Sequence, residues 1–349
     1  MKLNPKFEQR MKLLLGKDYN SYCKILDERY LNSVRCNTLK ISPEELKKRL
    51  EKKWEIKQPY KQYPEIFIIE GRKPFGKDNE NQAKQGGGNS LDKSESSQGR
   101  GSMSSIYPIA PGEIGKALEH QLGYYYVQEV SSMMPPLVLS ADEKEVVLDI
   151  AAAPGSKTTQ IAMMMKNKGT LIANDISVPR IVALSANLQR CGIINNIITR
   201  EEGRQLCQKF KKINFQFDKI LLDAPCSGEG TLRTSPKTAS MFSENMIKKL
   251  SSIQKKLLEN AVEVLKKDGI LIYSTCTHAP EENEEVIDYI LKQGKVKLEE
   301  IKLPIKTRNG ITEWNNIKYS DELKKCARIY PMDNNTEGFF IAAIKKVRN

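Results

Sequence analysis

The feature that most constrains the fold is the alternation of short apolar runs with longer amphipathic segments over residues 146–344. The expected strands are 146–150, 170–175, 196–199, 219–223, 269–274 and 338–344, and the expected helices are 179–190, 246–267 and 281–292. Strands that alternate with helices at this spacing predict an α/β fold with a parallel-core, doubly wound sheet. Ligands on such a sheet bind beyond the carboxyl ends of the strands, so we expect the chemistry in the loops that follow them.

The N-terminal part of the chain predicts a small α+β module with a basic surface. Residues 34–39 and 65–69 read as strands, and Ser42 and Pro43 are typical of the N-cap and first position of a helix between them. Residues 1–60 contain 15 Lys and Arg against 8 Asp and Glu. This local surplus of positive charge favours contact with a polyanion.

The length of the chain and one change in composition predict its domain organisation. A chain of 349 residues exceeds the usual size of one domain, and we expect an N-terminal domain over 1–120 and a second domain over 121–349. Residues 71–105 are polar and rich in Gly and Ser. Such a stretch cannot bury enough apolar surface to offset the entropy lost on ordering, so we expect a disordered insertion at about 71–105.

The overall charge points towards nucleic acid as a partner. The formal net charge is +13 and the pI is near 9.2, although a lysine-rich solvated surface would give the same balance. We expect no membrane span, because no stretch is long and apolar enough to cross a bilayer. We also expect no signal peptide, because no apolar run follows the first charged residues. The expected location is the cytoplasm.

The cysteines and histidines limit the chemistry that is available. There are seven cysteines, an odd number, and they show no CxxC pairing, so we expect neither a disulfide framework nor a zinc site. Only two histidines are present. Catalysis must therefore depend mainly on Cys, Asp, Glu or Lys, and we expect no metal.

The loop at 149–158 has the composition of a ligand-binding turn. Its small residues allow close approach of the backbone, and the helix that follows offers free N–H groups. It matches neither the dinucleotide fingerprint nor the P-loop. A tight structural turn would explain its alanines and glycine but not Lys157. The second expected strand ends at Asp175, which can bind the hydroxyls of a ribose or simply cap a helix.

Two cysteines stand in polar, glycine-containing surroundings at expected strand ends. Cys226 lies within 223–230 and Cys276 within 274–277. Buried, inert thiols are the usual alternative. A thiolate that adds to carbon 6 of a pyrimidine makes carbon 5 nucleophilic, and a base must then remove the carbon 5 proton before the thiol can leave. Asp223 is placed to contact the N3 edge of the ring. These residues leave open which cysteine is the nucleophile.

The sequence resembles the NOL/NOP/Sun (RsmB-like) family of RNA 5-methylcytosine methyltransferases, in the style of archaeal members that modify tRNA. The matching blocks are 34–40, 123–133, 149–158, 223–230, 274–277 and 335–340. The resemblance covers nearly the whole chain apart from 71–105. It implies a class I (Rossmann-like) methyltransferase sheet that binds S-adenosyl-L-methionine, with an RRM-like N-terminal module that binds the RNA backbone.

The resemblance also implies roles for individual residues. Cys276 would be the nucleophile, whereas Cys226 would assist proton removal and enzyme release; DNA cytosine-5 methyltransferases use their Pro-Cys cysteine as nucleophile instead. Asp223 and Lys157 would face the target base. The implied cofactor-binding residues are Ala151, Ala152, Ala153, Pro154, Gly155, Ser156, Lys157, Asp175, Arg180, Glu202 and Asp223.

Two positions depart from the family pattern. Glu202 replaces an aspartate that contacts the adenine amino group, so the acceptor is kept on a side chain one methylene longer. Ala151 stands where many members have cysteine. We expect that position to contact the cofactor through its backbone, so this second change should matter little.

We therefore expect a SAM-dependent RNA (cytosine-5-)-methyltransferase that acts on tRNA through a covalent Cys–cytosine adduct. Ribosomal RNA is the alternative substrate. A catalytically silent RNA-binding protein should lack a cysteine, Asp223 or the cofactor loop, and all of these are present. A small-molecule or protein methyltransferase would not need paired cysteines. We expect a monomer with no membrane partner.

Overall fold

The structure is a computed structural model that describes residues 3–73 and 107–348. The insertion expected at 71–105 falls almost wholly outside these described residues. Over the part of the chain that is described, no helix has the length and apolar character needed to cross a membrane.

The larger sheet has five neighbouring parallel strands, which extend from β9 to the edge strand β7. Its order is β11-β14-β15-β9-β8-β5-β6-β7, and β10 pairs with β15. The parallel strands are β5 (Val146–Asp149), β6 (Thr170–Asn174), β7 (Asn196–Thr199), β8 (Phe217–Asp223) and β9 (Leu265–Thr275). β15 (Phe339–Lys346) runs antiparallel beside β9. The chain order reverses between β5 and β8, and ligands bind at such a point in open α/β sheets.

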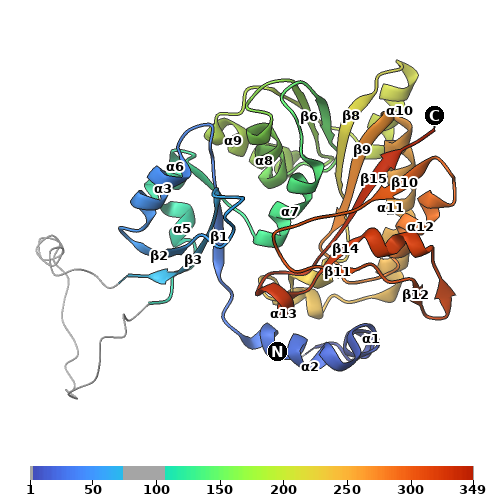
Figure 1. Cartoon of the computed structure of the whole chain (residues 1–349), viewed down its shortest axis with the longest axis horizontal. Coiled ribbons are helices and arrows are strands. Elements are labelled where there is room, and N and C mark those ends of the chain that lie inside the picture. Colours follow the sequence, from blue (N-terminus) through green and yellow to red (C-terminus); the bar gives the residue numbers. More distant parts are fainter. Residues whose placement is uncertain (1–2, 74–106, 349) are drawn as a thin grey trace, which may run out of the picture.

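Helices cover both faces of this sheet, which confirms the doubly wound α/β prediction (Figure 1). One face packs against α10 (Gly203–Lys212), α11 (Glu244–Glu263) and α12 (Glu284–Leu291), in a core that includes Leu206, Leu258 and Ile287. The other face packs against α7 (Val130–Leu139), α8 (Ser156–Met164) and α9 (Val178–Cys191), in a core that includes Met133, Ile161 and Leu184.

Two expected helices differ from the observed ones at their ends. The helix expected over 246–267 ends at Glu263, because Leu265 is fully buried and pairs with Phe217 at the start of β9. The helix expected over 281–292 begins only at Glu284. In both cases contacts with distant segments outweigh local helix propensity.

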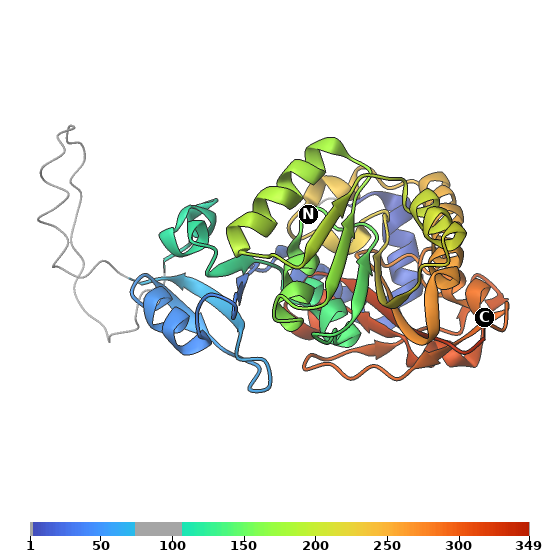
Figure 2. The ribbon, with the colours of Figure 1, turned by 90° about the horizontal axis from the view of Figure 1, so that it is seen from above.

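The smaller sheet is four-stranded and antiparallel, in the order β2-β3-β1-β4. Its elements are β1 (Asn32–Cys36), α3 (Pro43–Leu50), β2 (Trp54–Lys57), β3 (Ile66–Arg72), α5 (Glu113–Lys116), α6 (Leu118–Gln121) and β4 (Tyr125–Val127). This βαββαβ order is a split β-α-β arrangement, which agrees with the expected α+β module. Ser42 caps α3 by accepting a hydrogen bond from the N–H of Glu45 at 3.2 Å, as its sequence predicts. This α+β module lies to one side of the larger sheet and its helices (Figure 2).

The remaining elements connect or flank these two sheets. They are α1 (Pro5–Leu15), α2 (Tyr19–Asp27), β10 (Val296–Glu299), β11 (Arg308–Asn309), β12 (Glu313–Trp314), β13 (Ile317–Lys318), β14 (Ala327–Ile329), α13 (Pro331–Asn334) and the 3-10 turns Gly16–Asp18, Glu229–Thr231, Pro236–Ala239 and Asp321–Lys325.

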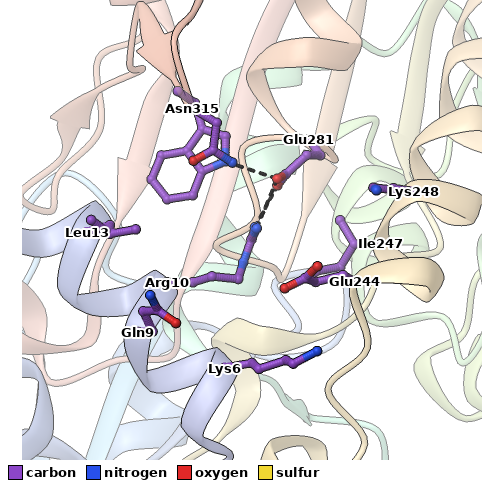
Figure 3. Close-up of a pocket in the computed structure, with 10 residues that line it drawn as sticks. Lys6, Gln9, Arg10, Leu13, Glu244, Ile247, Lys248, Glu281 and Asn315 are labelled. Atoms are coloured by element: carbon purple, nitrogen blue, oxygen red, sulfur yellow. Dashed lines mark hydrogen bonds and ion pairs between the residues drawn. The ribbon is translucent and has the colours of Figure 1, made fainter.

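The two N-terminal helices pack against segments that flank the larger sheet. Phe7 and Tyr22 share a buried cluster with Leu232. Arg10 of α1 forms an ion pair of 2.7 Å with Glu281, beside a cavity of about 300 Å³ that α1 and α11 help to line (Figure 3). Both α1 and α2, and also β4, therefore make contacts across the expected boundary between residues 120 and 121, and the two-domain division stays a prediction.

Candidate functional site

A cavity of about 400 Å³ opens at the carboxyl ends of the parallel strands. Its lining residues are Ile150, Ala151, Asn174, Asp175, Ile176, Arg180, Glu201, Glu202, Gly203, Asp223, Ala224, Pro225, Cys226, Ile253, Leu257 and Cys276. Its volume lies within the range of small-ligand sites. The cavity thus brings together seven of the residues predicted from sequence: Ala151, Asp175, Arg180, Glu202, Asp223, Cys226 and Cys276.

The two cysteines meet because of the register between β8 and β9. Asp223 pairs with Ser274 at the ends of these parallel strands, and Cys226 and Cys276 follow within three residues. Their Sγ atoms lie 3.4 Å apart. The hydrogen bond with Cys276 and burial both raise the pKa of the Cys226 thiol well above its usual value. Cys226 is therefore a protonated thiol that can donate to the sulfur of Cys276.

Asp223 is held in place by two polar contacts. One carboxylate oxygen accepts a hydrogen bond of 2.7 Å from the Ser274 hydroxyl, and the other lies 2.7 Å from Nζ of Lys157. Burial lowers the pKa of Lys157, but the charge of Asp223 and its hydrogen bond more than offset this and leave the pKa raised. Lys157 therefore stays charged although its residue is only 8% exposed.

The loop after β5 is built around a glycine and a buried acid. Gly155 has φ +104° and precedes α8, and an added Cβ would lie 3.0 Å from Cδ1 of Leu184. One oxygen of Asp149 accepts from the hydroxyl of Thr158 at 2.7 Å, while the other is buried without a hydrogen-bond partner. Burial raises the pKa of Asp149 to about 7. A cationic ligand group at this loop would offset the cost of that unpaired oxygen.

Not all of the predicted loop lines the cavity. Ala151 does, whereas Ala152 and Ala153 are buried and Pro154 is exposed. The carbonyl of Ala153 accepts a hydrogen bond of 2.5 Å from Arg180. This contact joins the loop after β5 to helix α9.

Asp175 has one oxygen that is free of hydrogen bonds. Its Oδ1 accepts from the N–H of Ser177 at 2.9 Å. Its Oδ2 lies 3.3 Å from the Arg180 guanidinium in an ion pair, but it accepts no hydrogen bond and is buried. A ribose hydroxyl could supply that bond, so these residues fit the nucleoside part of S-adenosylmethionine.

Glu202 lines the cavity but is already engaged as a helix cap. Its two oxygens accept from the N–H groups of Arg204 at 3.1 Å and Gln205 at 3.2 Å, at the start of α10. An adenine amino group could use the remaining lone pairs of the same carboxylate.

One side of the cavity is lined by apolar side chains that were not predicted from the sequence. Ile176 and Ile253 are 61% and 41% exposed, and Leu257 lies one turn after Ile253 on α11. Their sequence signal is only apolar character, which does not distinguish a cavity wall from a core. Gly203 directly follows Glu202 in the sequence, but nothing in the sequence predicts that it lines the cavity.

Gly203→Ala tests whether the cavity binds the cofactor. An added Cβ would lie 2.7 Å from Cγ2 of Ile150 and 2.9 Å from Cδ1 of Leu257, both of which line the cavity. Overpacking of this kind costs about 1–3 kcal/mol, so we expect calorimetry to show S-adenosylmethionine affinity reduced about tenfold or more. Gly115→Ala is the matched control, because its Cβ would meet nothing within 4 Å. Equal affinities for both variants would place the cofactor elsewhere.

Two family models match the chain. The model described as 16S rRNA methyltransferase RsmB/F matches residues 136–345. The model described as the N-terminal domain of 16S rRNA methyltransferase RsmF matches residues 3–83. Together they cover the residues that form the cavity and most of those that form the smaller sheet.

Individual relatives agree with these matches. The tRNA (cytosine(49)-C(5))-methyltransferase of Pyrococcus abyssi is 39% identical over 99% of this chain and 97% of its own. A mouse 28S rRNA (cytosine-C(5))-methyltransferase is 39% identical over 68% of this chain, which spans only 30% of that longer relative. Among solved structures, NSun6 from Pyrococcus horikoshii with the S-adenosylmethionine analogue SFG has a TM-score of 0.77 at 28% identity, with 99% of both chains covered. A methyltransferase homolog protein from the same organism gives a TM-score of 0.77 at 34% identity, over 99% of this chain and 95% of its own.

Proposed function

Because the chain belongs to the NOL/NOP/Sun family of RNA cytosine-5 methyltransferases, we propose that it methylates carbon 5 of a cytosine in tRNA. The observation that carries this proposal is the pair of cysteines 3.4 Å apart at the edge of the cavity. Methyl transfer to an exposed heteroatom would need no such pair. S-adenosylmethionine, when bound, supplies an electrophilic methyl group.

In the proposed mechanism Cys276 attacks carbon 6 of the cytosine as a thiolate. The new S–C6 bond converts the ring into an enamine whose carbon 5 is nucleophilic. This carbon takes the methyl group from bound S-adenosylmethionine, which leaves as the thioether S-adenosylhomocysteine. The carboxylate of Asp223 faces the N3 side of the ring, where it would accept a hydrogen bond from the amino group on carbon 4, and the charge of Lys157 at 2.7 Å keeps this carboxylate oriented. Cys226, as a thiolate that has lost its own proton to solvent, then takes the proton from carbon 5. The electron pair of that C–H bond re-forms the C5–C6 double bond, and the S–C6 bond breaks to release the Cys276 thiolate.

The hydrogen bond between the two thiols is consistent with a mechanism in which Cys276 attacks first and Cys226 acts afterwards. The largest contribution to the raised pKa of Cys226 is its hydrogen bond with Cys276. Once the Cys276 sulfur is bonded to carbon 6, it no longer carries a thiolate charge that favours a protonated neighbour. The pKa of Cys226 should then fall, so its thiol loses its proton more readily and provides the thiolate that the carbon 5 step needs.

The choice of tRNA rests on the relative that matches along nearly the whole chain. Ribosomal RNA is the second candidate, because the mouse relative and a Vibrio parahaemolyticus relative, 35% identical over 90% of this chain and 56% of its own, carry rRNA methyltransferase names. The basic N-terminal module would contact the RNA backbone, while the cytosine leaves its stack to reach Cys276. Monomeric state and cytoplasmic location stay predictions.

The proposal is tested with purified enzyme, S-adenosylmethionine, and tRNA and rRNA in separate reactions. Bisulfite sequencing then identifies each methylated cytosine. We expect conversion-resistant cytosine in tRNA at a single position. Methylation of rRNA alone would select the second candidate, and the absence of new 5-methylcytosine in either RNA would contradict both.

A further inference from the structure

Four consecutive residues, 281–284, form the end of the connection from β9 to α12 and the first residue of α12, and their side chains are largely buried. Each of the four contacts a different part of the site or its surroundings. We infer, on the basis of the proposed function, that Glu282 and Asn283 are positioning residues, each of which fixes one of the two reacting cysteines.

Glu282 holds the loop of Cys226. Its Oε2 accepts a hydrogen bond of 3.0 Å from the N–H of Ser227 and one of 2.8 Å from the side-chain amide of Gln254. The same amide donates to the carbonyl of Pro225 at 2.8 Å. Because Pro225 and Ser227 flank Cys226, these bonds fix the backbone on both sides of the thiol.

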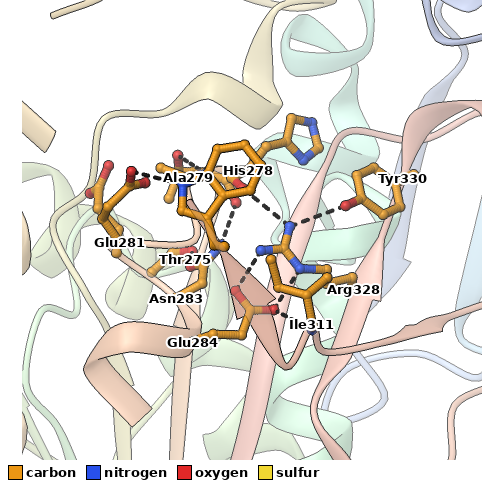
Figure 4. A network of polar contacts seen from close by, with 12 residues as sticks. Thr275, His278, Ala279, Glu281, Asn283, Glu284, Ile311, Arg328 and Tyr330 are labelled. Carbon is orange, nitrogen blue, oxygen red and sulfur yellow. Dashed lines mark hydrogen bonds and ion pairs between the residues drawn. The ribbon is translucent and has the colours of Figure 1, made fainter. Parts of the chain in front are cut away.

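Asn283 holds the loop of Cys276 in a comparable way (Figure 4). Its Oδ1 accepts from the hydroxyl of Thr275 at 2.6 Å, and its Nδ2 donates to the carbonyl of Thr277 at 3.0 Å. Thr275 and Thr277 flank Cys276. The carbonyl of Cys276 itself accepts from the N–H of Gly230 at 2.8 Å.

The outer two residues anchor the segment to the rest of the domain. Glu281 accepts two hydrogen bonds from Arg10, at 2.7 and 3.0 Å (Figure 3). Glu284 forms a bidentate pair with Arg328 at 2.5 and 2.6 Å, and Arg328 also donates to the carbonyl of His278 at 3.1 Å (Figure 4). Glu284 and Arg328 are 0% and 2% exposed, so movement of this end would separate buried charges.

Together these hydrogen bonds fix the positions of the two thiols relative to each other. Glu282 and Asn283 are neighbours in the chain, so the loops that they hold are fixed relative to one another. A hydrogen bond of 2.7 Å between the hydroxyls of Ser227 and Thr277 joins the same two loops. Nucleophile and helper must both reach one cytosine ring, and a displacement of about 1 Å can cost on the order of 10²-fold in rate.

The test compares two pairs of variants that act on different loops. Glu282→Gln and Gln254→Ala loosen the Cys226 loop, so methyl transfer should proceed while release slows, and a covalent protein–RNA adduct should accumulate. Asn283→Ala and Thr275→Val loosen the Cys276 loop, so formation of the adduct should slow on the order of 10²-fold without accumulation. Adducts are quantified on denaturing gels after single-turnover reactions, and S-adenosylmethionine affinity is measured for each variant.

Glu285→Gln is the matched control, because Glu285 follows the segment directly and pairs with Lys255 near the surface. It should behave as the wild type. General destabilisation would lower both adduct formation and turnover in all four variants, so opposite adduct responses of the two pairs separate positioning from stability. If the wild-type enzyme is active and both pairs of variants change adduct levels in the same way, the positioning inference is wrong while the proposed function stands. A wild-type enzyme that methylates no RNA would instead contradict the proposed function.

Discussion

Cys276→Ala is expected to lose RNA methylation by on the order of 10⁴-fold or more, because removal of a nucleophile leaves only binding and electrostatic effects. No covalent adduct should form. The Lys157–Asp223 ion pair and the polar contacts of Asp175 do not involve the Cys276 sulfur, so cofactor affinity should remain close to that of the wild type. Methyl transfer is followed with radiolabelled cofactor, and affinity by calorimetry.

The control for this variant is Cys23→Ala, which removes another free, partly exposed thiol outside the cavity. It should retain full activity. Full methylation by Cys276→Ala would exclude the covalent mechanism in which this residue attacks the ring, whatever the cofactor affinity shows.

Cys226→Ala is expected to form the covalent adduct but to lose its release. Cys276 can still attack carbon 6 and methyl transfer can follow, but the sulfur that lies 3.4 Å from Cys276 in the wild type is missing, so no thiolate is available there to take the carbon 5 proton. The enzyme should accumulate as a protein–RNA species that survives denaturing electrophoresis and disappears on RNase treatment. Turnover should fall to roughly one cycle per enzyme, since the covalent intermediate is not released.

The double variant Cys226→Ala/Cys276→Ala provides the control, because it removes the attacking sulfur and should trap no RNA. If Cys276→Ala traps RNA and Cys226→Ala does not, the roles of the two cysteines are exchanged, as in DNA cytosine-5 methyltransferases. If neither variant traps RNA, another group removes the proton from carbon 5.

The order of the elements could be predicted because its signals are local. β7 occupies the predicted range 196–199, and the Ser42 cap forms as expected. Apolar periodicity and capping preferences depend on residues within one or two turns of each other. The predicted end of the helix over 246–267 was wrong because it depends on a distant contact: Leu265 pairs with Phe217, which is far away in the sequence.

The residue pattern was enough to predict that Asp223 ends one parallel strand, and that Cys226 and Cys276 follow strand ends at the same edge of the sheet. The contacts among these groups depend on the folded chain: the two sulfurs lie 3.4 Å apart, Lys157 pairs with Asp223, and single oxygens of Asp149 and Asp175 remain without hydrogen bonds. The positioning roles inferred for Glu282 and Asn283 could not be predicted from the sequence either. Their partners are two backbone groups in loops, at Ser227 and Thr277, and two side chains, Gln254 on α11 and Thr275 at the end of β9. Only the folded chain brings these groups within hydrogen-bond distance.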